Sequence, residues 1–552
     1  MKRDIVKLGE QSFDVLIVGG GIHGAAAVRQ CAEQGMKAAL IEKADFGGAT
    51  SANSLKIIHG GFRYLQHLNI KRMRESIVSR RLMSQLSPEN IRALRCAIPN
   101  SGWGLRSKML MRLALLLNDV ISFDRNRGVR QECRIPAGEI LSLEECRKQF
   151  PLIDWTGKTG GAIWHDAIAL NSERLTLAFV QQAVQLGATV ANYLELKEIL
   201  VEAGKAVGVR AYDSVSGNDL LIKAEALIIS AGSNNDRLLG RHQNKRDMQK
   251  KWAKAVNVVV KRKLLDDTAI GLTGEADFTD KDAVIKKNGR FFFFVPWRGY
   301  TMIGTTYSFD KNTSAVKADR GDIEDILREV NDIFPGAALT LDEVGNVHAG
   351  LVPAYSHASR KDEVQLVKET EVADLTKKVV NPIQGIFTIK SVKYTTAPLV
   401  AFSTAKKVAA YLGFPLPKKI QFSLNPSGAE ENKAENSHAH GRLLQDRYGS
   451  LSGKVGKYIA ADNDLLCADT PLYGGEVKYF IKEEMARTLS DIVFRRSPVA
   501  SAECPSTKIL TLIAERMALH LDWKEEKISR EIKEVENAFD WRNSAPALGK
   551  RS

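Results

Sequence analysis

Three glycine residues and one acid are the first residues in the chain whose types and spacing suggest chemistry. Gly19, Gly21 and Gly24 match the pattern G-x-G-x-x-G, and Glu42 follows 18 positions after Gly24. In such a turn the first glycine permits a tight bend, the second lets backbone approach a pyrophosphate, and the third lets a helix pack closely on a strand. The N-terminus of that helix attracts phosphate, and an acid at Glu42 can accept hydrogen bonds from ribose hydroxyls. The pattern predicts dinucleotide binding without distinguishing FAD from NAD.

The segments around these glycines have the patterns of a βαβ unit, which would position them. They are an apolar strand at Phe13–Val18, a helix at Ala25–Gln34 closed by Gly35, and a second strand at Lys37–Ile41. A short apolar run is typical of a buried parallel strand. A glycine turn between a strand and a helix, with an acid at the end of the next strand, is the context that the motif requires.

Later segments predict further strands and a helical C-terminus. Ala224–Ser230 is another buried-strand pattern, and Arg290–Thr306 has the pattern of two antiparallel strands around a Trp-Arg-Gly turn. Asn425–His440 is polar and poor in large apolar residues, which indicates a linker. We expect a helix over Glu476–Arg496, because four apolar residues there fall at helical spacing: Ile481, Met485, Leu489 and Ile492.

The composition is that of a soluble protein with more than one domain. The 552 residues are 44% hydrophobic and 26% charged, which excludes the disordered and membrane-spanning classes. A net charge of +14, from 79 basic and 65 acidic residues, suggests an anionic partner such as a phosphorylated substrate, a nucleotide or an acidic lipid. A basic surface that serves only solubility would give the same count. We expect no nucleic acid partner, because no basic stripe is interleaved with aromatic residues.

Cysteine usage and apolar runs indicate a cytoplasmic protein. The six cysteines are scattered, without metal-binding or redox spacing, which favours a reducing compartment and predicts no metal site. Cys31 falls in a helical pattern and is expected to be a small core residue. The N-terminus lacks the apolar stretch of a secretory signal, and no run approaches the ~18 apolar residues of a membrane span.

One amphipathic segment, Trp103–Phe123, leaves two interpretations open. It places five apolar residues on one face and three charged residues on the other: Met109, Leu113, Leu116, Leu117 and Val120 against Lys108, Arg112 and Asp119. A basic amphipathic helix can lie in the plane of a membrane surface. The commoner use of this pattern is a helix packed on a domain core.

The segment Ala49–Leu65 connects the chain to a known family. It reads ATSANSLKIIHGGFRYL and resembles the flavin-proximal loop of FAD-dependent glycerol-3-phosphate dehydrogenases, whose pattern is S-S-x-(S/N)-x-K-x-I-H-G-G-x-R-Y-L. The resemblance continues, in the family's order, at Phe294–Thr306, Lys393–Thr396 and Glu476–Arg496. It therefore covers nearly the whole chain and implies that the dinucleotide is FAD.

The resemblance also implies an architecture. The expected fold class is α/β, with a Rossmann-like FAD-binding domain, an inserted antiparallel-sheet substrate domain and a C-terminal all-α domain. The expected boundaries are 1–424 for the FAD-binding domain with substrate-binding segments at roughly 80–165 and 250–350, 425–440 for the linker, and 441–552 for the C-terminal domain.

Roles for individual residues follow from the same resemblance. In the family, flavin takes a hydride from the carbinol carbon of the substrate while a base takes the hydroxyl proton. His59 is either that base or a histidine that only hydrogen-bonds the flavin or its loop. Arg63 and Tyr64 match positions that hold the anionic end of the substrate, and a guanidinium fork binds phosphate or carboxylate well. Lys393 matches a lysine beside flavin and substrate, where a cation can stabilise developing negative charge.

The expected site residues fall into three sets. The catalytic set is His59, Arg63 and Lys393, and the substrate-binding set is Arg63, Tyr64, Lys393 and His348. The cofactor-binding set is Gly19, Gly21, Gly24, Glu42, Ser54, Lys56, His59, Gly60, Gly61, Gly232 and Thr395. Gly60 and Gly61 would let backbone pass close to the isoalloxazine ring.

The chain departs from the family's pattern in the substrate pocket. Where the family has an arginine in a G-V-R-P segment, this chain has Leu351 and Val352 between a glycine and a proline. Loss of one of the two arginine guanidinium groups that hold the substrate dianion weakens binding, because charge-assisted hydrogen bonds contribute roughly 1.5–3 kcal/mol each. Ser391 and Val392 replace a Gly-Gly pair, and Tyr307 replaces an aspartate. His348 could take over the anion contact.

Three functions remain open at this point. The first is FAD-dependent oxidation of a secondary alcohol, with sn-glycerol 3-phosphate converted to dihydroxyacetone phosphate. The second is the same chemistry on another polyol phosphate, a hydroxy acid or an amine, and the third is a flavin-binding protein without turnover. Quinone or oxygen would accept the electrons, the protein could contact acidic lipid at the cytoplasmic face of the membrane, and the C-terminal helices could support a homodimer.

Overall fold

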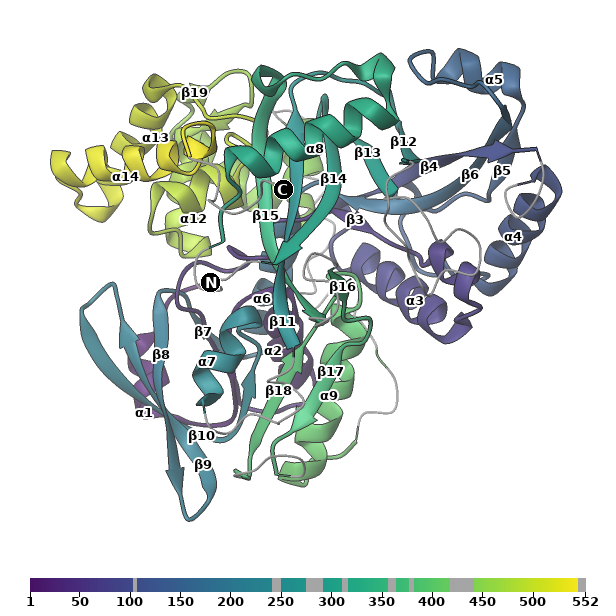
Figure 1. Ribbon diagram of the computed structural model, residues 1–552. Coiled ribbons are helices and arrows are strands. Elements are labelled where there is room, and N and C mark those ends of the chain that lie inside the picture. Colours follow the sequence, from purple (N-terminus) through teal and green to yellow (C-terminus); the bar gives the residue numbers. More distant parts are fainter. Residues whose placement is uncertain are drawn as a thin grey trace.

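Two large sheets and a group of C-terminal helices make up the part of the chain that the structure describes (Figure 1). The structure is a computed structural model. It describes residues 1–102, 107–240, 250–274, 291–309, 316–355, 364–376, 382–416, 420 and 441–544. The predicted linker 425–440 lies outside the described residues. No helix in these ranges is both long enough and apolar enough to span a bilayer.

The first sheet contains the predicted βαβ unit. Its strands are β1 (Ser12–Val18), β2 (Ala38–Ile41), β7 (Thr189–Ala191), β8 (Leu194–Glu202), β9 (Lys205–Asp213), β10 (Asn218–Ile229), β17 (Glu371–Asp374) and β18 (Ile386–Lys390). The order is β17–β18–β10–β1–β2–β7, parallel from β18 to β7, and the β8–β9 hairpin extends β10. The three strands predicted at 13–18, 37–41 and 224–230 are confirmed, because all lie in this buried parallel sheet.

Helices α2 (Ile22–Glu33), α6 (Ser172–Gln185) and α9 (Ala397–Leu412) pack against one another on one face of this sheet. The small residues Ala25, Ala26 and Ala27 are buried in α2 and permit this close approach. Cys31 is fully buried in the same helix, as expected for a small core residue. Two shorter helices, α1 (Ile5–Glu10) and α7 (Asn235–Leu239), border the sheet.

The second sheet is antiparallel apart from one pair. Its strands are β3 (Ile57–Ile58), β4 (Ile91–Ser101), β5 (Glu139–Leu141), β6 (Lys158–Ala169), β11 (Lys250–Val260), β12 (Thr268–Thr273), β13 (Phe291–Trp297), β14 (Tyr300–Phe309), β15 (Val344–Tyr355) and β16 (Gln365–Leu366). Only β4 and β12 pair in parallel among these strands. The predicted hairpin around the Trp-Arg-Gly turn is confirmed as β13 and β14.

Four helices accompany the second sheet. They are α3 (Ile70–Leu86), α4 (Lys108–Ile121), α5 (Leu143–Gln149) and α8 (Arg320–Ile333). Helix α8 buries Ile323, Ile326 and Val330 in a core shared with the sheet residues Val258 and Phe292, because its apolar residues recur at helical spacing. Helices α3, α4 and α5 lie on the right of Figure 1.

The C-terminal part is helical and has its own core. Its elements are α10 (Gly441–Tyr448), α11 (Ser452–Ala461), α12 (Gly474–Glu484), α13 (Thr507–Leu521), α14 (Glu525–Asn537) and a short hairpin of β19 (Leu465–Cys467) and β20 (Leu472–Tyr473). The hairpin is the one departure from the all-α composition expected for the described part of this region. The mixed α/β architecture with a helical C-terminal part is otherwise as expected.

The prediction of one helix over Glu476–Arg496 was wrong. Helix α12 ends at Glu484, Met485 has a φ of +57°, and a π-helical turn follows at Asp491–Arg496. The apolar residues at helical spacing are nevertheless all buried: Ile481, Met485, Leu489 and Ile492. The break has a polar cause, because Glu484 accepts a hydrogen bond from Arg174 of α6 at 2.6 Å and Asp491 accepts from backbone N–H groups on its N-terminal side.

Candidate active site

The glycine turn has the geometry that the spacing predicted. Gly19 has a φ of +106°, and a Cβ atom there would lie 2.5 Å from the carbonyl oxygen of Ser230 at the end of β10. A Cβ atom at Gly24 would lie 1.8 Å from the carbonyl oxygen of Gly19. Real Cβ contacts do not come this close, so both positions require glycine if β1, β10 and α2 are to meet.

The acid after β2 is directed at the turn. Glu42 accepts hydrogen bonds from the backbone N–H groups of Gly20 at 2.6 Å and Ala44 at 2.9 Å. Burial raises the pKa of its carboxyl, while these two N–H groups lower it. Gly21 caps α2, and the N–H of Ile22 donates to Ser51 Oγ at 3.0 Å. An acceptor group and a helix N-terminus therefore lie side by side, as ribose and pyrophosphate require.

His23 supplies an independent test of whether a flavin dinucleotide fits this turn. Its Nε2 lies 3.0 Å from the carbonyl oxygen of Lys393; because a carbonyl can only accept, Nε2 carries the proton and Nδ1 is left as an acceptor. Burial lowers the pKa of His23 to about 4, so the ring is neutral at pH 7. Nδ1 is buried and has no hydrogen-bond partner among the described residues. The hydroxyl groups of a flavin dinucleotide are donors that would satisfy it, so these residues fit the cofactor.

The predicted catalytic residues lie on two loops that contact each other. The N–H of His59 donates to Thr395 Oγ1 at 3.3 Å, and the Lys393 ammonium lies 4.1 Å from the centre of the Tyr64 ring. Burial, and then repulsion from the Arg63 guanidinium, lower the pKa of Lys393 to about 8. The loop after β3 and the loop after β18 therefore bring the cations of Arg63 and Lys393 within electrostatic range of each other, on the segments that carry His59 and Thr395.

Asp166 and Arg80 are part of this arrangement, and the sequence did not reveal them. Asp166 Oδ2 lies 3.5 Å from His59 Nδ1, and Asp166 Oδ1 accepts from Arg80 Nη1 at 2.8 Å and from the Gly60 N–H. Burial alone would raise the pKa of Asp166, but these partners hold it at about 2. The carboxylate orients His59 with Nδ1 toward it and leaves Nε2 for a substrate. The signal in the sequence was weak, because Asp166 is one acid within the apolar strand β6.

The local structure requires glycine at the two positions after His59, whatever role they have beside flavin. A Cβ atom at Gly60 would lie 2.2 Å from Arg80 Nη1. Gly61 has a φ of +87°, and a Cβ atom there would lie 2.9 Å from Tyr64 Cδ2. Close approach of Arg80 and the left-handed backbone therefore already require glycine at both positions.

Three expected site residues are placed in a different role. The Lys56 ammonium is buried and donates to Glu173 and to Ser172 Oγ, so it is not available to a flavin phosphate. His348 is buried, its Nδ1 lies 3.2 Å from the carbonyl oxygen of Ser54, and burial followed by Lys56 lowers its pKa to about 4. A neutral imidazole supplies no charge for an anion, so His348 does not replace the absent arginine. The Ser54 hydroxyl accepts from the N–H of Lys56 at 3.1 Å, which is a local turn contact.

The remaining positions lie close to the turn. Gly232 lies three positions after the end of β10, has a φ of +59°, and its Cβ position meets no described atom within 4 Å. Leu351 of β15 exchanges hydrogen bonds with Thr50, at 3.1 Å through its N–H and 3.2 Å through its carbonyl. The segment that replaces the family's arginine is therefore held against the loop of residues 49–65.

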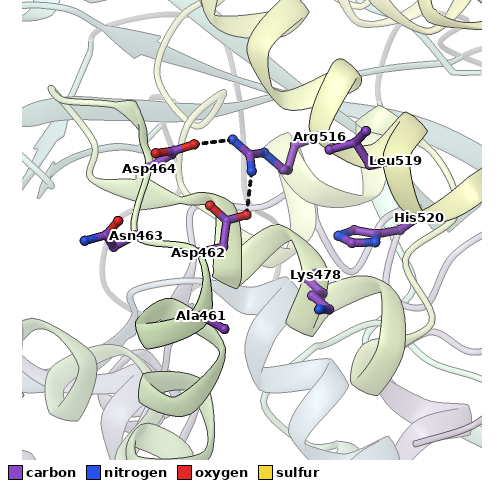
Figure 2. Close-up of a pocket in the computed structure, with 8 residues that line it drawn as sticks. All are labelled: Ala461, Asp462, Asn463, Asp464, Lys478, Arg516, Leu519 and His520. Atoms are coloured by element: carbon purple, nitrogen blue, oxygen red, sulfur yellow. Dashed lines mark hydrogen bonds and ion pairs between the residues drawn. The ribbon is translucent and has the colours of Figure 1, made fainter.

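A cavity in the C-terminal part lies apart from these residues. It has a volume of about 420 Å³ and is lined by Asp462, Asp464, Lys478, Arg516 and His520, among others (Figure 2). Arg516 donates to both aspartates, at 2.7 and 2.6 Å. This cavity contains none of the residues that the turn and the His59 loop bring together.

Comparison with known proteins agrees with a dinucleotide site at the turn and specifies which dinucleotide binds. Residues 14–401 match the family model described as FAD dependent oxidoreductase. This chain belongs to the FAD-dependent oxidoreductase family, and its cofactor is FAD. Residues 423–528 of this FAD-dependent oxidoreductase match a second model, the C-terminal domain of alpha-glycerophosphate oxidase.

Individual relatives match this chain over most of their length. The FAD-dependent oxidoreductase is 26% identical to glycerol-3-phosphate dehydrogenase from Synechocystis sp., with 96% of this chain and 97% of the relative covered. It is 28% identical to glycerol-3-phosphate dehydrogenase from Mycobacterium leprae, with 95% and 88% covered. The structure of glycerol-3-phosphate dehydrogenase from Bacillus halodurans complexed with FAD superposes with a TM-score of 0.73 at 23% identity, covering 99% and 98% of the two chains, and shows the same fold.

Proposed function

We propose that this enzyme oxidises sn-glycerol 3-phosphate to dihydroxyacetone phosphate. The observation that carries the proposal is His59, backed by the buried carboxylate of Asp166, on the same loop as Arg63, which lies within electrostatic range of Lys393. A base next to an anion-binding pair is the arrangement that a phosphorylated alcohol requires. Relatives called glycerol-3-phosphate dehydrogenase, matched over nearly their whole length, support the choice of substrate.

The side chains contribute to the reaction in two ways: one accepts a proton, and others bind the negative charge of the substrate. When bound, FAD would supply a two-electron acceptor for the hydride of the carbinol carbon. His59 Nε2 takes the hydroxyl proton, because Nδ1 faces Asp166 and the resulting imidazolium is stabilised by that carboxylate. The carbon thereby loses a hydride and its oxygen a proton, and the product is a ketone.

The anionic end of the substrate is assigned to the loop after His59. Arg63 provides a guanidinium with fork geometry, and Lys393 provides a compact ammonium that lies over the Tyr64 ring. The repulsion between Arg63 and Lys393 is relieved when a phosphate binds between them, so phosphate binding favours the charged form of Lys393.

Anaerobic reduction of the flavin tests the substrate. Mixing the purified enzyme with millimolar glycerol 3-phosphate without oxygen is expected to bleach the flavin absorption. Bleaching by another polyol phosphate, a hydroxy acid or an amine, but not by glycerol 3-phosphate, would select the alternative substrate that Leu351 and Val352 suggest. Bleaching by dithionite alone would select the flavin-binding protein without turnover.

The pH dependence of KM tests Lys393. Because its pKa is lowered from the usual range to about 8, the cation is present below pH 8 and is lost above it. The KM for glycerol 3-phosphate should therefore rise about tenfold per pH unit above 8 in the wild-type enzyme. Lys393→Arg keeps its charge and should give a KM that stays level up to pH 10. A rate that increases through pH 8 would instead mean that the neutral amine acts as a base.

We also propose that the enzyme binds the surface of a membrane through α4. The apolar face of this helix is turned to solvent rather than to the core: Met109, Leu113, Leu116, Val120 and the following Phe123 are 77, 55, 63, 68 and 80% exposed. Leu68 and Ile70 add exposed apolar surface beside it, and Lys108 and Arg112 are exposed as well. Exposed apolar area of this kind flanked by basic residues suits an acidic lipid surface. Quinone dissolved in that membrane would then be the electron acceptor, with oxygen as the alternative.

Sedimentation with lipid vesicles tests this surface. The wild-type enzyme is expected to sediment with phosphatidylglycerol vesicles, and Leu113→Glu with Leu116→Glu should lower the bound fraction at least tenfold, because two exposed leucines that would insert into the lipid are replaced by charges. Leu519→Glu is the matched control, since this leucine of α13 is 71% exposed and lies outside the surface. Equal losses in both proteins, or no sedimentation of the wild type, would contradict the proposal.

A further inference from the structure

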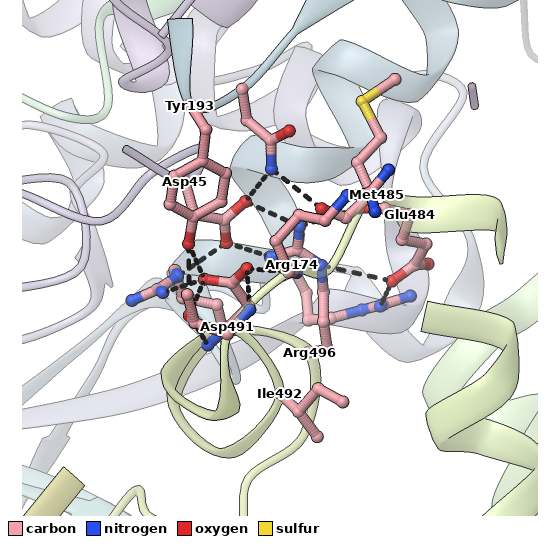
Figure 3. Close-up of polar contacts among 12 residues, drawn as sticks. Asp45, Arg174, Tyr193, Glu484, Met485, Asp491, Ile492 and Arg496 are labelled. Atoms are coloured by element: carbon pink, nitrogen blue, oxygen red, sulfur yellow. Dashed lines mark hydrogen bonds and ion pairs between the residues drawn. The ribbon is translucent and has the colours of Figure 1, made fainter. Parts of the chain in front are cut away.

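A buried ionic cluster joins the C-terminal part to the loop behind the glycine turn (Figure 3). Its centre is Asp45, three positions after Glu42. Arg496 donates to both carboxylate oxygens of Asp45, and Arg495 Nε donates to Asp45 Oδ2 at 2.6 Å. Asn192 Nδ2 donates a fourth hydrogen bond to Asp45, at 3.0 Å. The Asp45 and Arg496 side chains are 0 and 1% exposed, so the bidentate pair is shielded from water.

The loop that Asp45 anchors is in direct contact with the turn. The N–H of Gly47 donates to the carbonyl oxygen of Gly20 at 3.0 Å, and Ser51 Oγ accepts from the first N–H of α2. A Cβ atom at Gly20 would lie 2.6 Å from the Phe46 ring. Residues 44–51, which we call the Asp45 loop, therefore form one wall of the site that holds the pyrophosphate.

A second set of contacts holds the same loop from its other side. The N–H of Tyr193 donates to the carbonyl oxygen of Ala44 at 2.9 Å, and the Tyr193 hydroxyl donates to Asp491 at 2.7 Å. Asn192 Nδ2 also donates to the carbonyl oxygen of Met485 at 2.9 Å. The break in the helix after Glu484 is thus what brings the π-helical turn and its two arginines to the Asp45 loop.

We infer that Arg495 and Arg496 are positioning residues for FAD: the C-terminal part completes the cofactor site by holding the Asp45 loop against the glycine turn. The residues act through Asp45 and Gly47 and do not themselves belong to the turn. The arginines hold the pKa of Asp45 below its usual range against the opposing effect of burial, so the loop is held by a charged pair at neutral pH. Binding of FAD and docking of the π-helical turn consequently favour each other.

This inference requires only that FAD binds the glycine turn, so it is independent of the substrate. A cluster that served only overall stability would lower the melting temperature without a selective effect on FAD. The two cases differ in the dissociation constant of FAD, measured by titrating the FAD-free full-length protein with FAD and following flavin fluorescence.

Arg496→Met and Asp45→Asn are each expected to raise the Kd of FAD at least tenfold and to reduce the increase in melting temperature that FAD produces. The Kd of FAD for the double variant should be no higher than that of the single variant that binds FAD less tightly, because both changes remove the same ion pair. Asp45→Asn keeps the size of the side chain and serves as the test if Arg496→Met does not fold.

Arg516→Met is the matched control in the same C-terminal part. Arg516 also donates to two carboxylates, Asp462 and Asp464, but lies at the cavity of Figure 2, away from the Asp45 loop. The Kd of FAD for the Arg516→Met variant should stay within twofold of the wild-type value. The inference is overturned if folded Asp45→Asn protein binds FAD with unchanged Kd, or if Arg516→Met weakens FAD binding as much as Arg496→Met.

Discussion

Replacing His59 with glutamine is expected to lower the rate of flavin reduction by about 10²- to 10⁴-fold while FAD stays bound. Glutamine keeps a polar side chain of similar length but cannot take a proton. The backbone bond from His59 N–H to Thr395 is unaffected by the substitution, so the loop should keep its place. Glu42 and Gly24, which we propose contribute to the cofactor site, lie on separate segments, and FAD content should therefore equal that of the wild type.

The measurement is the single-turnover rate of flavin bleaching by glycerol 3-phosphate without oxygen. Asp166→Asn should lower the same rate less than His59→Gln does, because it removes the orientation of the imidazole and leaves the base in place. His520→Gln, in the C-terminal cavity, is the control and should react at the wild-type rate. A reduction of less than threefold in His59→Gln would show that His59 only hydrogen-bonds its surroundings.

Replacing Gly24 with alanine is expected to abolish FAD binding. The added methyl group would lie 1.8 Å from the carbonyl oxygen of Gly19, and neither backbone segment can retreat without separating α2 from β1. The pyrophosphate then loses both the tight turn and the helix N-terminus. The purified variant should contain no FAD, and its Kd for added FAD should be at least 100-fold above that of the wild type, on the order of a 3 kcal/mol loss.

Gly453→Ala provides the control for adding a methyl group to a helical glycine. A Cβ atom at Gly453, in α11, meets no described atom within 4 Å, and alanine favours a helix. This variant should contain as much FAD as the wild type and melt at the same temperature or higher. Full FAD content in Gly24→Ala would contradict the close packing of turn and helix.

The parts of the fold that depend on local pattern were predictable. The strands at 13–18 and 224–230 are short buried apolar runs, and the glycine spacing between the first of them and α2 is by itself typical of a dinucleotide site. The hairpin of β13 and β14 followed from its turn residues. The resemblance at residues 49–65 then distinguished FAD from NAD, because the glycine turn alone is common to both.

The spacing of apolar residues led to a wrong prediction where a continuous helix and a broken helix bury the same side chains. Ile481, Met485, Leu489 and Ile492 are all buried, as a helix would require, yet the helix ends between them. Periodicity reports which side chains face the core and does not reveal a break whose cause is a polar contact with a distant segment. The amphipathic segment 103–123 posed the reverse problem, since its pattern fits a core helix and a surface helix equally, and only the fold shows that α4 turns its apolar face outward.

By itself, the sequence determined the cofactor-binding turn and the loop that carries His59, Arg63 and Tyr64, because these depend on residues adjacent in the chain. Only the tertiary structure decided the partners of the charged groups. Lys56 pairs with Glu173 at a separation of 117 positions, and Asp45 with Arg496 at 451. An ion pair leaves no periodic pattern in the sequence, and its partners are fixed only when the chain has folded and water has been excluded from between them.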